Sequence, residues 1–148
     1  MELSRILTIG LKGANVYGRF CQPVCKRYGI NQMGFNTLMF FANNPEYNTA
    51  RDLCRLRGIK SGIVSVAVET LIEAGYLTRR IDVADRRIQR LEVTKKAAGL
   101  VQAGRAAQRE FKEALLSRLS SDEIERFAQI SQKLIDTIDE LNDGGGER

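Results

Sequence analysis

The chain has 148 residues, the usual size of one domain, and 43% of them are hydrophobic, which is enough to bury a core without disulfides or metal. Charged residues make up 28% and the net charge is +5, so the chain is not disordered as a whole and is attracted to polyanions such as nucleic acid. It contains no His, which excludes Ser-His-Asp and Cys-His catalysis and histidine metal sites. With no phosphate-binding glycine loop either, we expect neither an enzyme nor a cofactor.

The three cysteines are Cys21, Cys25 and Cys54. An odd number without CxxC spacing predicts neither a zinc cluster nor a disulfide framework, and is typical of a reducing cytoplasm. Charged residues interrupt the apolar residues of the first 12 positions, and the longest uncharged run, 28–45, contains several Asn. We therefore expect no secretion signal, no membrane helix and a cytoplasmic location.

Charge is unevenly distributed along the chain. The net charge is +3 over residues 1–48, +5 over residues 49–100 and −3 over residues 101–148. A basic middle third beside an acidic last third predicts a nucleic-acid surface in the middle, with scaffold helices around it.

The first predicted helix covers residues 3–27 and has two apolar faces, which indicates burial on both sides, as in a subunit interface. Pro23 should kink or end it near its last turns, and Gly29 should stop it. One face carries Leu3, Leu7, Ala14, Tyr17 and Cys21, and the other carries Ile6, Ile9, Val16, Phe20 and Val24.

Three shorter helices follow. Asn31 is a predicted N-cap for residues 32–43, and Thr49 with Asp52 predicts a capped helix over residues 50–56. A tight turn at residues 57–59 leads to a helix over residues 60–74, which Gly75 should terminate. Two short helices joined by a turn that contains glycine match a helix-turn-helix.

The hydrophobic period then changes. Residues 76–81 and 88–93 are predicted strands around a polar loop, 82–87. A hairpin directly after the second helix of a helix-turn-helix is a wing. Leu91 and Val93 are expected to share one of its faces.

Two long helices complete the predicted order. Thr94 should cap a helix over residues 95–118, and the capping box Ser120-x-x-Glu123 should start a last helix that reaches about Leu141. Gly144-Gly145-Gly146 marks a flexible tail, residues 143–148. The first of these helices should turn Leu100, Val101, Phe111, Leu115 and Leu116 inward, and the second carries a stripe of Ile124, Phe127, Ile130, Leu134, Ile138 and Leu141.

This order of elements resembles the MarR family of bacterial transcription regulators. The stretches that carry the resemblance are residues 68–80 (Val-Glu-Thr-Leu-Ile-Glu-Ala-Gly-Tyr-Leu-Thr-Arg-Arg), Asp85-Arg86-Arg87, and Leu91-Glu92-Val93-Thr94. The resemblance implies a mainly α fold with a winged helix-turn-helix lobe at residues 31–94. It also implies dimerisation helices at residues 1–30 and 95–142, within a single domain, 1–148.

The helix at residues 60–74 is the expected reader of the major groove, because a helix-turn-helix directs the N-terminal end of its second helix at base edges. The resemblance gives Asp85 the role of an orienting carboxylate and Arg87 that of a cation inserted into the minor groove, which a charge-assisted bond between them supports. Arg79, Arg80 and Arg90 are read either as phosphate contacts or as strand-edge charges. The expected DNA-binding residues are Lys60, Ser61, Gly62, Ser65, Val66, Arg79, Asp85, Arg86 and Arg87.

The sequence departs from the family pattern in the expected reading helix. Ser65-Val66 stands where many members have Ser-Arg, and Gly62 and Ile63 stand where hydroxyl residues are common. Val66 can only contact a thymine methyl group or face inward. The helix therefore offers few side chains that can form hydrogen bonds to bases. A protein-binding module that has lost operator recognition stays an alternative.

Regulation has two candidate sites. Tyr17, Phe20, Phe40 and Phe41 are either lining residues of an effector cleft or plain core. Cys21 and Cys25 lie one helical turn apart, and Lys26 and Arg27 could lower the pKa of Cys25 for redox sensing; the other reading is two small core residues. We expect a homodimer that binds double-stranded DNA at a pseudo-palindromic operator, most simply a repressor that a small molecule releases.

Overall fold

The computed structural model describes residues 2–145 and divides the chain into two compact units, Met1–Phe111 and Lys112–Arg148. The fold is mainly α with one two-stranded sheet, as predicted. Its elements are α1 (Leu3–Tyr28), α2 (Gln32–Asn43), α3 (Ala50–Arg57), α4 (Ser61–Glu73), β1 (Leu77–Ile81), β2 (Gln89–Val93), a 3-10 turn (Lys95–Ala97), α5 (Ala98–Leu116) and α6 (Ser121–Gly144).

Three helices start at the side chains that the sequence indicates. The Asn31 side chain accepts a hydrogen bond from the backbone N–H of Gly34 at 2.7 Å, which caps α2. Thr49 and Asp52 form a reciprocal capping box at α3, and Ser120 and Glu123 form another at α6. These bonds satisfy backbone donors that have no partner within the helix.

Helix α1 passes through Pro23 and ends at Tyr28. Gly29 follows with φ 65°, and its N–H donates to the carbonyl of Cys25. This left-handed conformation favours glycine because it has no Cβ. The helix thus continues for five residues after Pro23, and its end is set by Gly29.

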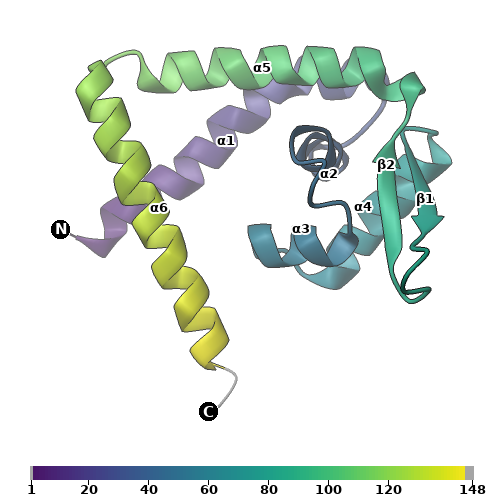
Figure 1. Ribbon diagram of the computed structural model, residues 1–148. Coiled ribbons are helices and arrows are strands. Elements are labelled where there is room, and N and C mark those ends of the chain that lie inside the picture. Colours follow the sequence, from purple (N-terminus) through teal and green to yellow (C-terminus); the bar gives the residue numbers. More distant parts are fainter. Residues whose placement is uncertain (1, 146–148) are drawn as a thin grey trace. The chain divides into compact units, whose positions relative to one another are not determined.

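The core of the first unit is built around α2. Figure 1 views this helix nearly end-on, with α3 and α4 on one side and α5 and the end of α1 on the other. Most of α2 is buried, and α4 and β2 pack against its aromatic and aliphatic side chains. The largest fully buried side chains are Phe35, Leu38, Met39, Leu53, Leu71, Leu77 and Leu100.

Helix α5 begins differently from the prediction. The Thr94 hydroxyl does not cap the helix; it donates instead to the carbonyl of Gly75 at 2.6 Å. Gly75 has φ 81°, so this bond links the left-handed residue after α4 to the segment that leaves the sheet. The chain then makes one 3-10 turn before α5 starts at Ala98, three residues later than expected.

Close packing of α5 on α2 depends on a glycine. A Cβ at Gly104 would lie 2.5 Å from Met39 Sδ and 3.0 Å from Phe35 Cε2. Both neighbours are buried, so neither has free space to move into. Further along α5, Leu115 is exposed, contrary to the prediction that it faces inward.

The sheet is a two-stranded antiparallel hairpin with Leu77 opposite Val93 and Arg79 opposite Leu91. Leu91 and Val93 share a face with Leu77, as predicted, since cross-strand partners lie on the same side of a hairpin. The other edge of β2 is used as well, because the N–H of Leu91 donates to the carbonyl of Asn48 at 2.8 Å.

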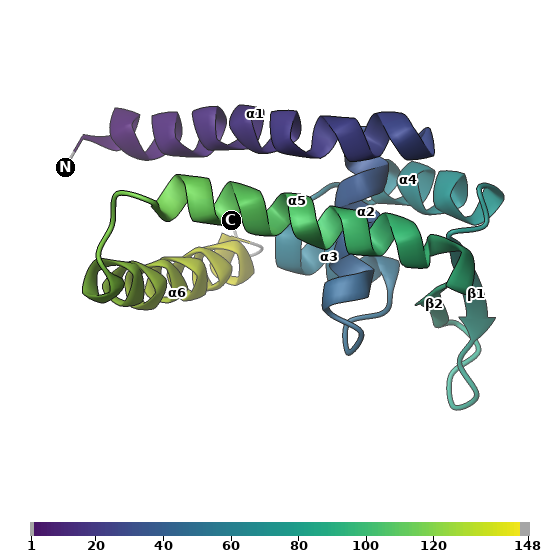
Figure 2. The same ribbon diagram turned by 90° about the horizontal axis from the view of Figure 1, so that it is seen from above.

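Two helices have apolar residues that stay exposed. Helix α6 extends to Gly144, beyond the expected end near Leu141, and none of its residues is buried; the rest of the expected tail, 146–148, lies outside the described residues. Figure 2 shows α1 along its length; its exposed residues include Leu3, Ile6, Leu7, Ile9 and Leu11. Within residues 2–145 no helix is both long and apolar enough to span a membrane.

Candidate nucleic-acid interface

Helix α4 separates a buried face from an exposed one. Its buried residues, Val64, Ala67, Val68 and Leu71, pack toward α2 and α3. The five residues of this segment that the sequence assigns to DNA contact are all exposed: Lys60, Ser61, Gly62, Ser65 and Val66. The structure therefore presents the whole predicted reading surface to solvent.

The N-terminal end of α4 carries unpaired backbone donors. Lys60 precedes the helix and makes no side-chain cap, and its carbonyl accepts the N–H groups of Ile63 and Val64. The N–H groups of Ser61 and Gly62 come before these first helical bonds. Such groups attract phosphate oxygens and other anions.

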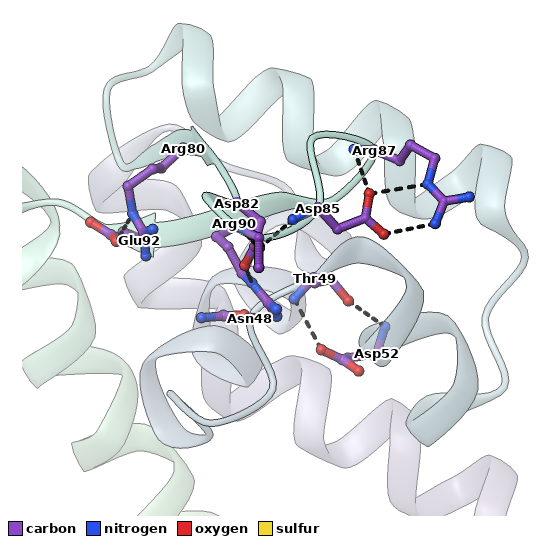
Figure 3. A network of polar contacts seen from close by, with 10 residues as sticks. Asn48, Thr49, Asp52, Arg80, Asp82, Asp85, Arg87, Arg90 and Glu92 are labelled. Carbon is purple, nitrogen blue, oxygen red and sulfur yellow. Dashed lines mark hydrogen bonds and ion pairs between the residues drawn. The ribbon is translucent and has the colours of Figure 1, made fainter.

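The tip of the wing holds an arginine in a bidentate ion pair. Arg87 donates from Nε to Asp85 Oδ1 at 3.0 Å and from Nη2 to Asp85 Oδ2 at 2.8 Å, while its backbone N–H also donates to Oδ1 at 3.0 Å. Figure 3 shows this arrangement. The Arg87 side chain is 90% exposed and that of Asp85 is 33% exposed. The carboxylate thus fixes the guanidinium while leaving it accessible.

Asp82 shapes the same turn from its other end. Its Oδ1 accepts the backbone N–H groups of Ala84 and Asp85, each at 2.9 Å, and its Oδ2 accepts Arg90 Nε at 2.9 Å. Arg90 also donates to Asn48 Oδ1 at 3.0 Å. Figure 3 shows how this chain of contacts ties the wing to the segment before α3.

Both wing carboxylates are held in the charged form. The N–H of Asp85 and the guanidinium of Arg90 lower the pKa of Asp82, and the side chain and N–H of Arg87 lower the pKa of Asp85. The Asp85 carboxylate in turn raises the pKa of Arg87. Hydrogen bonds to the charged form explain both directions, so the turn keeps its ion pairs throughout the neutral range.

The remaining arginines of the wing differ in their partners. Arg79 pairs with Glu69 of α4, and Arg80 pairs with Glu92 across the strands at 3.0 Å. Arg90, paired with Asp82, is partly buried. Within residues 2–145, Arg86 is exposed and forms no ion pair. The charges of Arg86 and Arg87 are thus the most accessible ones at the tip.

The expected ligand-binding residues separate into two sets. Tyr17 and Phe40 line a cavity of about 520 Å³ together with Asn36, Met39, Arg57 and Gln108. Phe41 is buried in the core, and Phe20 lies outside this lining, where it contacts Phe111 with ring centroids 5.7 Å apart.

Gln108 donates a hydrogen bond to the Tyr17 hydroxyl at 2.9 Å. Burial raises the pKa of Tyr17 to about 12. The cavity wall therefore presents a neutral, hydrogen-bonded phenol.

The thiols do not fit the expected redox chemistry. Cys21 is fully buried and Cys25 is 9% exposed, and both are free. Burial raises the pKa of each thiol, which is opposite to the expected effect of Lys26 and Arg27. A raised pKa lowers the thiolate fraction, and the thiolate is the reactive form.

Sequence reasoning did not find the Asp82–Arg90–Asn48 chain. A signal for its first part was available, because an Asp that bonds the N–H two residues ahead is typical of a turn start. The contact with Asn48 spans 42 residues, so no local pattern indicates it.

Comparison with known proteins identifies the segment that contains this interface. Residues 28–88 match the family model described as the MarR family. This segment is similar to the MarR family. The match covers α2 to the tip of the wing, which includes every expected DNA-binding residue.

Solved structures titled as MarR-type proteins share the fold over nearly the whole chain. A MarR protein from Peptoclostridium difficile is 16% identical, with a TM-score of 0.81 over 95% of this chain and 91% of that one. The MepR–DNA complex of S. aureus is 18% identical, with a TM-score of 0.76 over 93% and 96%. A transcription regulator MarR from Oenococcus oeni is 23% identical, with a TM-score of 0.71 over 91% and 99%. The resemblance drawn from the sequence and the winged-helix fold are therefore confirmed.

Proposed function

We propose that this MarR-like protein is a homodimeric transcription regulator that binds a pseudo-palindromic operator. Helix α4 enters the major groove, and Arg87 of the wing enters the adjacent minor groove. The observation that carries this proposal is the Asp85–Arg87 pair, which holds a 90% exposed guanidinium at the tip of a hairpin. Narrow A·T-rich minor grooves have the negative potential that attracts such a group.

Two copies are needed to complete the molecule. Helix α6 has 24 residues and buries none of them, and helices in proteins gain most of their stability by packing an apolar face. The exposed apolar side chains of α1 and α6 supply such a face. We propose that they pair with a second copy, which gives two reading helices related by two-fold symmetry, as a palindromic site requires.

We further propose that a small molecule releases the operator, which makes the protein a repressor. The cavity beside Tyr17 and Phe40 supports this, because it combines aromatic walls with the Arg57 guanidinium, placed 5.1 Å from the Phe40 ring centroid. A planar aromatic anion suits that lining. Benzoate is a direct probe: it should weaken operator binding by the parent protein, and Arg57→Gln should reduce that effect.

Thiol sensing receives less support than ligand release, because both thiols of α1 are buried and their pKa values are raised. If oxidation were the signal, replacing Cys21 and Cys25 by Ser would abolish release by peroxide and leave basal binding. Genomic DNA as the partner implies the cytoplasm as the location.

Selection of bound sequences from random duplex DNA tests the proposal. A palindromic motif supports a regulator with two reading helices. Binding without any motif, or no binding, contradicts operator recognition and favours a protein-interaction module. Arg87→Ala should reduce recovery of the motif. Lys26→Ala, at an exposed cation in the last turn of α1, is a control away from the wing.

A further inference from the structure

We propose that a small apolar hollow on α4, lined by Gly62, Ile63 and Val66, reads thymine by holding its C5-methyl group. This inference rests on the proposed function and names the base that the helix would recognise. The hollow has a volume of about 340 Å³. Met33 at the start of α2 and Ala67 and Thr70 of α4 complete its lining, with Asn31 at the edge.

Two apolar side chains that line the hollow are exposed to solvent. Val66 is 68% exposed and Ile63 is 47% exposed, so neither faces the core. They lie on the same exposed side of α4 as Gly62. Of the four bases, only thymine offers a methyl group in the major groove for apolar contact.

Gly62 makes the hollow. A Cβ at this position would meet no atom within 4 Å, so packing within the chain does not require a glycine there. Glycine costs helix stability relative to alanine. Its presence one turn before Val66 leaves space for another molecule to approach the backbone closely.

Two polar side chains of α4 beside the hollow already have partners within the chain. The Thr70 hydroxyl donates to the Val66 carbonyl at 2.9 Å, and the Glu69 carboxylate pairs with Arg79. The Thr70 proton and the Glu69 charge are thus engaged within the chain. Methyl contact is therefore the recognition chemistry that this part of α4 has available, beside the hydroxyls of Ser61 and Ser65.

DNA is the occupant that the surroundings favour. Lys60 stands at the same end of α4, and the accessible charges of Arg86 and Arg87 lie on the wing that follows this helix. β1 packs directly against α4. Lys60 beside the hollow and two accessible arginines on the same lobe complement a polyanion, whose major groove also exposes methyl groups. An apolar protein partner would not account for these cations.

The test uses the selected operator with dT replaced by dU, one symmetric pair at a time, because this change removes only the methyl group. At one or two positions the parent protein should bind about fourfold more weakly per half-site, or about sixteenfold for both. Val66→Ala should lose a similar factor on the dT operator. The affinity of Val66→Ala should not fall further when dU is introduced at those positions.

Gly62→Ala provides a second variant that cannot fail through unfolding, since alanine favours a helix more than glycine does. Its methyl group should occupy the space beside the Gly62 backbone, so it should weaken binding to the dT operator more than to the dU operator. Ser65→Ala is the matched control on the same helix. It should weaken binding to both operators by the same factor.

Equal binding of dT and dU operators by the parent at every thymine would overturn the inference, as would Val66→Ala leaving both affinities unchanged. The second result would assign the hollow to a protein partner. Neither outcome affects the proposed function, which fails separately if no motif is selected and Arg87→Ala binds DNA as the parent does.

Discussion

Helices α4 and α6 are both amphipathic, but only α4 buries its apolar face within its own chain. α4 places Val64, Ala67, Val68 and Leu71 in the core. α6 is almost twice as long and leaves exposed Phe127, Ile130, Leu134, Ile135, Ile138 and Leu141. The two apolar patterns therefore differ in what covers them: the face of α4 stabilises the core of its own chain, and the face of α6 is the one that we propose a second copy covers.

The largest expected effect concerns α6. Leu134→Glu should weaken dimerisation by at least about 100-fold, because each dimer loses two buried leucines worth roughly 1.5–3 kcal/mol apiece. Sedimentation equilibrium measures the change. Gln129→Glu adds the same charge on the opposite side of the helix and should leave dimerisation close to that of the parent.

Leu134→Glu also tests whether α6 contributes to the stability of its own chain. Because α6 buries none of its residues, Leu134→Glu should retain the cooperative unfolding of the α2–α4 core in urea. Loss of that transition would mean that α6 stabilises its own chain as α4 does.

The next effect concerns the wing beside α4. Arg87→Ala removes one counterion-releasing contact per lobe, which lowers affinity about eightfold per half-site at 0.1 M salt and flattens the salt slope by about one unit per lobe. Titrations at several salt concentrations measure both. Arg86→Ala, next in the chain, should flatten the slope less, since no carboxylate orients its side chain among residues 2–145.

Asp85→Ala separates orientation from simple charge. Removal of a negative charge near DNA favours tighter binding, but a free Arg87 must lose rotamer freedom on insertion. The bidentate geometry predicts weaker binding. If the Asp85→Ala variant binds its operator more tightly than the parent, Asp85 does not orient Arg87, and the wing contributes only its positive charge.

A smaller effect tests the packing of the buried core, where α5 lies against α2. Gly104→Ala should lower the free energy of unfolding by about 1–2 kcal/mol, because overpacking against Met39 and Phe35 exceeds the gain in helix propensity. Urea denaturation measures this. Gly62→Ala, where nothing lies within 4 Å, should not be less stable than the parent, and an equal loss in both variants would contradict the packing argument.

The smallest effect lies at the cavity beside α2. Since the pKa of Tyr17 is about 12 in the folded chain and about 10 when unfolded, the folded state keeps a proton that the unfolded state releases. The stability from the neutral phenol is complete below pH 10 and falls as the pH rises toward 12.

For a partly buried ring the loss is about 1 kcal/mol. Tyr17→Phe should remove this part of the alkaline decline in urea unfolding measured at pH 9 and 11. An identical decline in the parent and the variant would contradict the shifted pKa.

Local chemistry allowed the sequence to determine the order of elements, the caps at Asn31, Thr49 and Ser120, the stop at Gly29 and the strand pair of the wing. Each depends on residues at most a few positions apart. The Asp85–Arg87 contact was also accessible, since only two positions separate its partners.

The tertiary structure decided what depends on distant neighbours. Thr94 bonds to Gly75 rather than capping α5, and Arg90 reaches Asn48 across 42 residues. The cysteines of α1 and Phe41 are buried because α2 and its neighbours surround them, which raises the thiol pKa values that adjacent cations were expected to lower. Val66 could face inward or outward from its pattern alone, and the packing of α4 placed it outside. Burial is a property of the assembled chain, so no local pattern could supply it.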